Sequence, residues 1–128
     1  SVQTLVSEAL EQIKTINSEE ALKMFNEKEC NLIDIRDVRE LQNEGQVEGA
    51  NHIPRGMLEF WLDPSSEYFK ENKIGNKKNI VLFCALGFRS ALATKALQDM
   101  GFTNVANASG GFNALKDYGI EVVTKEKK

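Results

Sequence analysis

The sequence is poor in the residues that build disulfide scaffolds, histidine-based metal sites and membrane spans. Its two cysteines, Cys30 and Cys84, cannot form a disulfide framework, and its single histidine excludes most histidine-based metal sites. Since no run of about 18 apolar residues occurs, we predict no transmembrane helix. The first residues also lack the basic and apolar segments of a secretory signal. We therefore expect a cytoplasmic protein with no metal, no cofactor and no membrane partner.

The composition predicts one globular domain. The chain has 128 residues, of which 41% are hydrophobic and 27% are charged. This is enough to bury a core but too short for two ordinary domains. The 16 basic residues are scattered except near the C-terminus, and the net charge is −3. Because a nucleic-acid-binding protein normally carries a concentrated basic face, we expect no nucleic-acid partner.

Short apolar runs alternate with amphipathic segments along the chain. The spacing of apolar residues predicts an N-terminal helix at 2–13, whose apolar stripe either packs on the domain or binds a protein partner. Further helices are predicted from Ser18, over 36–42, from Asp63-Pro64, over 90–100 and up to residue 118. Strands are predicted at 31–35, 50–53, 80–83 and 105–106.

This alternation is typical of an α/β fold with a mainly parallel central sheet and helices on both faces. We expect an amphipathic helical extension at 1–15, the α/β domain at 16–123 and a charged tail at 124–128. The polar stretch 70–79, which contains Gly75, is predicted to be a linker.

Cys84 stands where the most apolar predicted strand, 80–83, leads into a tight loop and then a helix. Ligands bind at such strand ends in parallel sheets. Loop N–H groups, the helix dipole and Arg89 all favour a negative charge on the sulfur. We therefore expect the pKa of Cys84 to lie in the range of about 3.5–7.5 found for activated cysteines. Gly87 permits a positive φ, and Ser90 is predicted to cap the helix.

A simpler interpretation competes with this one. A cysteine at the end of an apolar strand is often a small buried hydrophobic residue, and we expect this for Cys30. For Cys84, the succession of strand, cysteine, central glycine, arginine and serine favours a reactive thiol instead.

The loop itself reads Cys84-Ala85-Leu86-Gly87-Phe88-Arg89-Ser90. It resembles the Cys-x-x-Gly-x-Arg-Ser active-site loop of single-domain rhodanese sulfurtransferases. Three further segments match the family in the same order: Asp34-Ile35-Arg36 at a strand end, the Gly-Ala to Ile-Pro pattern within 45–54, and the Ser-Gly-Gly-Phe turn at 109–112. The resemblance extends over residues 16–123.

This resemblance implies a rhodanese-like domain that moves sulfane sulfur through a persulfide on Cys84. The sulfur would come from thiosulfate or a persulfide and pass to cyanide or a thiol. Cys84 and Arg89 would be the catalytic residues. The other loop residues would bind the substrate, namely Ala85, Leu86, Gly87, Phe88 and Ser90. Because Leu86 and Phe88 are apolar, we expect thiosulfate to be a poor donor.

Three residues outside the loop are further candidates for substrate binding. Asp34 and Arg36 either border the pocket or form a structural ion pair, and Arg55 either attracts an anionic donor or is a solvated surface residue. His52 is predicted to be a turn residue held by a hydrogen bond.

Two other functions compete with sulfur transfer. Cysteine phosphatases and arsenate reductases resemble the pattern Cys-x5-Arg, whereas only four residues separate Cys84 from Arg89 here, so a phosphate-sized cradle is disfavoured. A rhodanese-like interaction or sulfur-signalling module with little turnover is the other alternative.

Overall fold

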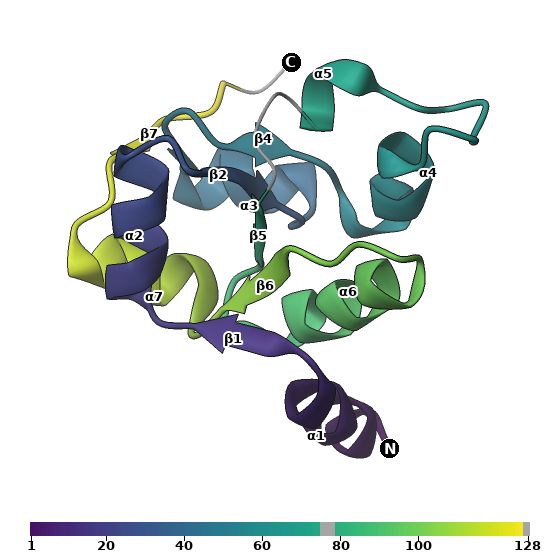
Figure 1. Ribbon diagram of the computed structural model, residues 1–128. Coiled ribbons are helices and arrows are strands. Elements are labelled where there is room, and N and C mark those ends of the chain that lie inside the picture. Colours follow the sequence, from purple (N-terminus) through teal and green to yellow (C-terminus); the bar gives the residue numbers. More distant parts are fainter. Residues whose placement is uncertain (75–78, 127–128) are drawn as a thin grey trace.

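A five-stranded parallel sheet forms the centre of the protein, in a computed structural model that describes residues 1–74 and 79–126. The strand order is β1-β6-β5-β2-β4, and every neighbouring pair is parallel (Figure 1). The strands are β1 (Lys14–Ile16), β2 (Cys30–Asp34), β4 (Asn51–His52), β5 (Asn79–Phe83) and β6 (Val105–Ala108). Since all strands run the same way, their carboxyl ends meet at one edge, where Cys84 follows β5.

Helices cover both faces of this sheet (Figure 1). One face carries α2 (Ser18–Asn26) and α7 (Gly111–Tyr118), and the other carries α4 (Leu58–Leu62) and α6 (Phe88–Asp99). The remaining elements are α1 (Val2–Gln12), α3 (Val38–Glu44), α5 (Glu71–Ile74), the 3-10 helix η1 (Arg55–Met57), and an antiparallel pair of β3 (Gln46–Val47) with β7 (Val122–Val123). The predicted α/β fold is confirmed.

The central strand β5 contributes to two separate hydrophobic cores. Val81 and Phe83 face the core beneath α2 and α7, whereas Leu82 and Cys84 face the core beneath α4 and α6. Successive side chains of a strand point to opposite faces, so a central strand covered on both sides must be apolar throughout. This explains why the most apolar run of the sequence is the one that carries the cysteine.

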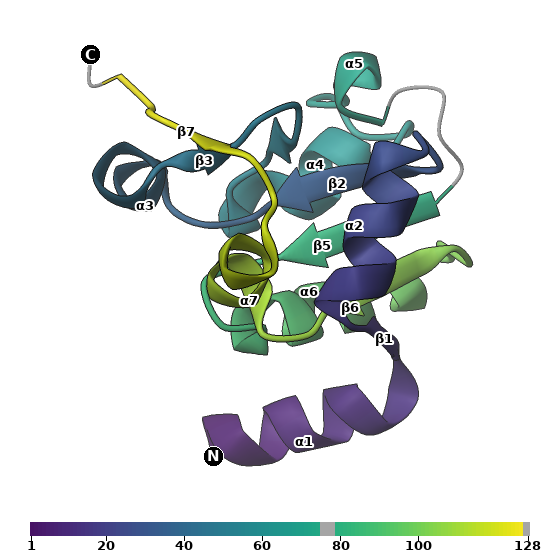
Figure 2. The ribbon, with the colours of Figure 1, turned by 90° about the vertical axis from the view of Figure 1, so that its left-hand side faces the viewer.

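The N-terminal helix α1 lies beyond the β1 edge of the sheet and packs against α6 (Figure 2). Gln98 of α6 donates a hydrogen bond of 3.0 Å to the carbonyl of Gln12. Ala9 is buried, but Val2 and Leu5 remain exposed. The predicted helix is therefore confirmed, and it packs on the domain with only part of its apolar stripe. The boundary predicted between residues 15 and 16 falls inside β1.

Two predictions between residues 63 and 79 are wrong. The carboxylate of Asp63 accepts hydrogen bonds from the N–H and hydroxyl of Ser65, at 2.9 and 2.8 Å, and so forms a turn where a helix was predicted to start. Within the predicted linker, residues 71–74 form α5 and Asn79 already belongs to β5. Gly75 lies outside the described residues.

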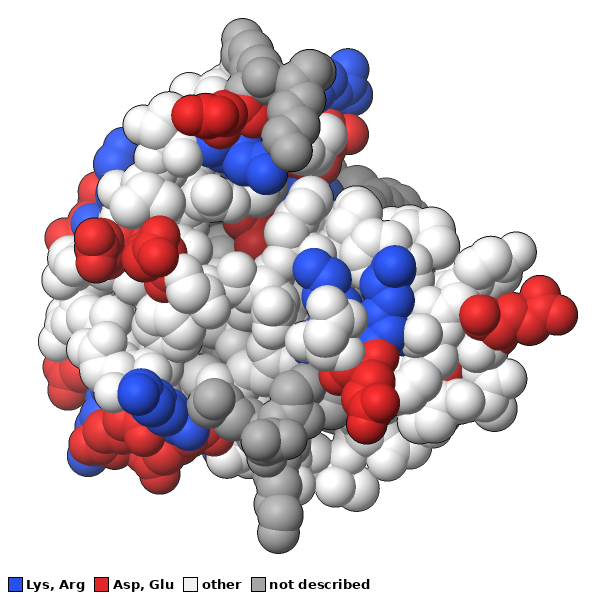
Figure 3. Space-filling model, turned by 90° about the horizontal axis from the view of Figure 1, so that it is seen from above, with Lys and Arg blue, Asp and Glu red and all other residues white. Residues whose placement is uncertain are grey.

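The surface mixes both signs of charge. On the face shown in Figure 3, acidic and basic side chains are interspersed over the molecule. Among the described residues, no helix is both long enough and apolar enough to cross a membrane.

Candidate active site

Residues 84–87 connect the carboxyl end of β5 to the first turn of α6. Gly87 is the N-cap of that helix and has a φ of +102°. A Cβ on this residue would lie 3.2 Å from the backbone nitrogen of Gly110, so both conformation and space favour glycine. The loop thus bends sharply enough to keep Cys84 buried, with 1% of its surface exposed.

The loop is fastened to the amino end of α7. The carbonyl of Cys84 accepts a hydrogen bond of 2.7 Å from the N–H of Phe112, and the carbonyl of Ala85 accepts one of 3.2 Å from Asn113. Gly111 makes this approach possible, because a side chain there would collide with both carbonyl groups. The Gly-Gly turn therefore serves to bring α7 against the cysteine loop.

Backbone donors surround the sulfur, as the sequence predicts. The N–H of Gly87 lies 3.2 Å from Sγ of Cys84, and the N–H of Ser90 lies 3.4 Å from it. The hydroxyl of Ser90 is also 3.4 Å from Sγ. Such donors stabilise a sulfur anion more than a neutral thiol.

Two opposing effects determine the pKa of Cys84. Burial is the largest single effect and raises the pKa, because it penalises the charged thiolate. The hydroxyl and N–H of Ser90 and the N–H groups of Gly87 and Leu86 lower it. Together these donors outweigh burial, so the pKa of Cys84 lies below its ordinary value. The direction agrees with the sequence prediction.

Ser90 has a different role from the one predicted. It is the third residue of α6, whose N-cap is Gly87, and no side chain caps the helix. The buried hydroxyl of Ser90 instead donates a hydrogen bond of 2.6 Å to Oδ1 of Asn107. The amide of Asn107, from β6, then donates to the carbonyl of Gly87 at 3.2 Å. Sequence reasoning missed Asn107, although a polar residue between Ala106 and Ala108 at a strand end was a visible signal.

Arg89 makes its main contact with an acidic residue rather than with the sulfur. Its guanidinium forms two parallel hydrogen bonds to Glu40 of α3, at 2.8 and 2.9 Å. Glu40 raises the pKa of Arg89 most, and Cys84 contributes less. In return, the hydrogen bond from Arg89 is the main reason that the pKa of Glu40 is lowered. The sulfur of Cys84 therefore faces an ion pair between Arg89 and Glu40, a partner that the sequence did not identify.

Asp34 and Arg36 form the structural ion pair that was one of their two predicted roles. Nη2 of Arg36 lies 2.8 Å from Oδ2 of Asp34, and the arginine side chain is fully buried. Its guanidinium stacks 4.0 Å from the ring centre of Phe112 and also donates to the carbonyl of Gly45. The pair therefore ties the end of β2 to α7 and to the end of α3.

The third candidate outside the loop, Arg55, and His52 also have partners. Arg55 pairs with Glu59, four residues later, at 2.7 Å. Nε2 of His52 lies 2.7 Å from the carbonyl oxygen of Arg36, so the predicted hydrogen bond is present. His52 belongs to strand β4, however, and the prediction of a turn residue is wrong.

The rim of the loop is apolar. Leu86 and Phe88 expose 53% and 58% of their surfaces. Phe88 also lines an apolar groove of about 370 Å³ together with Val2, Val6 and Leu10 of α1. The N-terminal helix thus lies next to the entrance of the cysteine loop.

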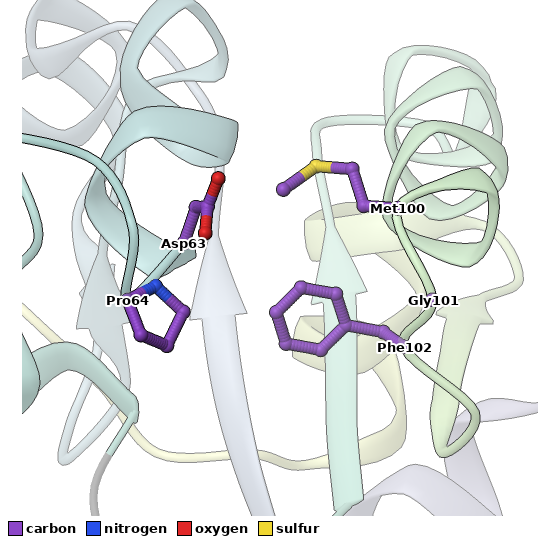
Figure 4. A pocket seen from close by; sticks show the side chains of 5 residues that line it. All are labelled: Asp63, Pro64, Met100, Gly101 and Phe102. Carbon is purple, nitrogen blue, oxygen red and sulfur yellow. The ribbon is translucent and has the colours of Figure 1, made fainter.

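A second hollow lies away from this site. Figure 4 shows Met100 and Phe102 facing Asp63 and Pro64 across it. Met100 and Phe102 follow the carboxyl end of α6, and Asp63 and Pro64 follow α4, whereas the cysteine loop precedes the amino end of α6. The hollow is therefore not part of the Cys84 site. Over residues 1–74 and 79–126, no group of three or more His, Cys, Asp or Glu residues could hold a metal ion.

Comparisons with known proteins agree on one family. The model of the rhodanese-like domain matches residues 17–118. A mouse (Mus musculus) protein, thiosulfate sulfurtransferase/rhodanese-like domain-containing protein 3, is 26% identical over 117 residues, which cover 88% of this chain and 74% of that protein.

Solved structures extend the similarity to nearly the whole chain. A Rhodopseudomonas palustris protein of unknown function, described as a possible tyrosine phosphatase, superposes with a TM-score of 0.88 and 38% identity over 96% of this chain and 94% of its own. The polysulfide-sulfur transferase homodimer of Wolinella succinogenes superposes with a TM-score of 0.73 and 29% identity, over 97% and 88%.

The sulfurtransferases among these relatives support sulfur transfer in general. Since the domain model matches most of the chain and the fold, the cysteine loop and the Gly-Gly turn agree with it, the chain belongs to the rhodanese-like domain family.

Proposed function

We propose that this protein is a sulfurtransferase that carries sulfane sulfur as a persulfide on Cys84. The observation that carries the proposal is the buried Sγ of Cys84, which two backbone N–H groups and a hydroxyl contact at 3.2 to 3.4 Å. These donors lower the pKa of Cys84 despite its burial, which favours the thiolate that the first displacement needs.

The reaction consists of two displacements at sulfur. In the first, the thiolate of Cys84 attacks the sulfane sulfur of the donor. The donor's S–S bond breaks, its remaining part leaves with the electron pair (sulfite in the case of thiosulfate), and a persulfide anion forms on Cys84. In the second, cyanide or a thiolate attacks the terminal sulfur. The S–S bond to Cys84 breaks, and the thiolate is restored. No net oxidant or reductant is needed.

Loop donors and Arg89 have distinct parts in this scheme. The N–H groups at the start of α6 hold the anion, as an oxyanion site holds developing charge. Arg89 adds positive charge at the entrance, reduced by its pairing with Glu40. A cytoplasmic location and a small-molecule donor and acceptor complete the proposal.

Phosphate chemistry fits this site less well. A phosphatase needs a wide loop and an arginine that binds the phosphate. Here the loop has four residues between Cys84 and Arg89, and the guanidinium of Arg89 is occupied by Glu40. The description of the Rhodopseudomonas relative as a possible tyrosine phosphatase is therefore not transferred to this chain. A module with little turnover differs from the proposal only in rate, which the experiments below measure.

Replacement of Cys84 tests the carrier assignment. After incubation with a sulfane donor, intact-protein mass spectrometry should show one added sulfur atom on the wild type and on Cys30→Ala, but none on Cys84→Ala. Cys30 is the matched control because it is the only other cysteine and is equally buried. Persistent loading of Cys84→Ala would refute the assignment.

Replacing either member of the ion pair between Arg89 and Glu40 should shift the pKa of Cys84, in opposite directions for the two residues. Arg89→Ala removes the positive charge and should raise the pKa of Cys84, which slows alkylation at pH values below the midpoint. Glu40→Gln keeps a hydrogen-bond acceptor but leaves the charge of Arg89 uncompensated, so it should lower the pKa of Cys84. The alkylation rate as a function of pH measures both. If neither midpoint moves, the loop donors alone stabilise the thiolate.

The apolar rim predicts weak use of thiosulfate, because a dianion near Leu86 and Phe88 loses hydration without gaining a partner. Leu86→Lys should raise kcat/KM for thiosulfate about tenfold, which corresponds to roughly 1.4 kcal/mol in the transition state. The gain should shrink with added salt, which screens charges over about 8–10 Å. Phe60→Lys is the control, since Phe60 is similarly exposed but lies on α4.

If the wild type turns over thiosulfate efficiently and Leu86→Lys does not change kcat/KM, the prediction that thiosulfate is a poor donor is wrong. The same steady-state measurement with glutathione persulfide should give a higher kcat/KM for the wild type than thiosulfate does.

We further propose that the protein partner of α1 is a second copy of this chain. The groove between α1 and Phe88 is apolar, and the Wolinella relative, which aligns with 97% of this chain, is described as a homodimer. Light scattering after size-exclusion chromatography should give the mass of a dimer for the wild type. Leu10→Glu, which places a charge in the groove, should give a monomer, and Phe60→Glu should remain dimeric. A monomeric wild type would contradict the proposal.

A further inference from the structure

A chain of buried hydrogen bonds leads from the sulfur into the sheet. Sγ of Cys84 contacts the hydroxyl of Ser90, that hydroxyl donates to Asn107, and the Asn107 amide donates to the carbonyl of Gly87. Cys84, Ser90 and Asn107 each expose at most 1% of their surface. Their polar atoms must therefore satisfy one another.

The direction of each of these hydrogen bonds follows from which groups can donate and which can only accept. The carbonyl oxygen of Gly87 can only accept, so the Asn107 atom that faces it must be the NH₂ group, at 3.2 Å. Oδ1 of Asn107 then faces Ser90 and can only accept. The short Ser90–Asn107 contact of 2.6 Å is therefore a hydrogen bond from the serine hydroxyl to the amide oxygen.

Ser90 has a single hydroxyl hydrogen, and Asn107 holds it. Toward the sulfur, the serine oxygen thus presents a lone pair. A neutral Cys84 thiol fits this arrangement, since its S–H can donate to that oxygen across 3.4 Å. A thiolate is stabilised by the backbone N–H groups but fits this arrangement less well, because the hydroxyl can donate to it only by rotating toward the sulfur and leaving Oδ1 of Asn107 without a donor.

We propose that Asn107 is a positioning residue that competes with the Cys84 thiolate for the hydroxyl hydrogen of Ser90. This inference rests on the proposed function, because it concerns how the same sulfur is controlled. By holding the hydrogen, Asn107 favours the states in which Sγ carries little charge, which are the thiol and the persulfide whose charge lies on the terminal sulfur. Asn107 thereby opposes the backbone N–H groups, which favour the thiolate.

Few charged groups act on the sulfur of Cys84 besides these hydrogen bonds. The charged groups that face the sulfur are Arg89 on α6 and, through it, Glu40 on α3. Cys84 belongs to the apolar core beneath α4 and α6, which also contains Leu82, Ala93 and Leu97. Besides Arg89, whose side chain also interacts with Cys84, the Ser90 hydroxyl is the side-chain group that contacts Sγ among the described residues.

The test measures the alkylation rate of Cys84 against pH in proteins that carry Cys30→Ala, so that Cys84 is the only thiol. Asn107→Leu has a similar size but no acceptor, so it releases the Ser90 hydrogen to the thiolate. Its midpoint should fall by about one pH unit, a roughly tenfold rise in thiolate fraction below the midpoint. Ser90→Ala removes the hydroxyl and should raise the midpoint.

The double variant separates competition from a structural role. In Ser90→Ala, the further change Asn107→Leu should no longer lower the midpoint. A purely structural Asn107 would predict the reverse, because a loosened loop misaligns the N–H groups and raises the midpoint in both backgrounds. A rise or no change in Asn107→Leu alone would therefore overturn the proposal, as would an equal fall in both backgrounds.

A second measurement needs no change at Asn107. The S–H stretching band of Cys84 in the Cys30→Ala protein at low pH should lie at the frequency of a hydrogen-bonded thiol, and it should shift to that of a free thiol in Ser90→Ala. An identical band in the two proteins would overturn the proposal. Neither readout requires sulfur transfer, so a protein that fails as a sulfurtransferase can still pass or fail this test.

Discussion

The site depends on one constraint, which is that an anionic sulfur must be stable in a buried position. Burial alone would keep Cys84 protonated, and the N–H groups at the start of α6 offset that cost. Those groups face the sulfur only because Gly87 bends the loop with a positive φ and Gly111 lets α7 approach it. The central position of β5 and the Gly-Gly turn both serve this geometry.

Two ion pairs relate the loop to the rest of the fold in different ways. The buried pair of Asp34 and Arg36 fixes the end of β2 beneath α7 and has no exposed surface at the arginine. The partly exposed pair of Arg89 and Glu40 instead joins α6 to α3 at the entrance. One pair therefore supports the framework, and the other sets the charge that a substrate meets.

Sequence patterns predicted the elements with strong periodicity and the loop that carries Cys84, because local spacing determines both. They missed the two- and three-residue strands β1, β3 and β7, whose short length leaves no pattern to detect. They also missed the partners of loop residues. Glu40 lies 49 positions from Arg89, and Asn107 lies 17 positions from Ser90, so only the packing of the sheet and helices brings them together.

The most direct test of the central claim is a crystal structure of the protein after incubation with a sulfane donor. The account predicts an additional sulfur atom bonded to Sγ of Cys84 and within hydrogen-bonding distance of N–H groups of residues 85–89. An unmodified Cys84 under conditions in which the protein transfers sulfur, or a second sulfur that points away from the loop, would contradict it.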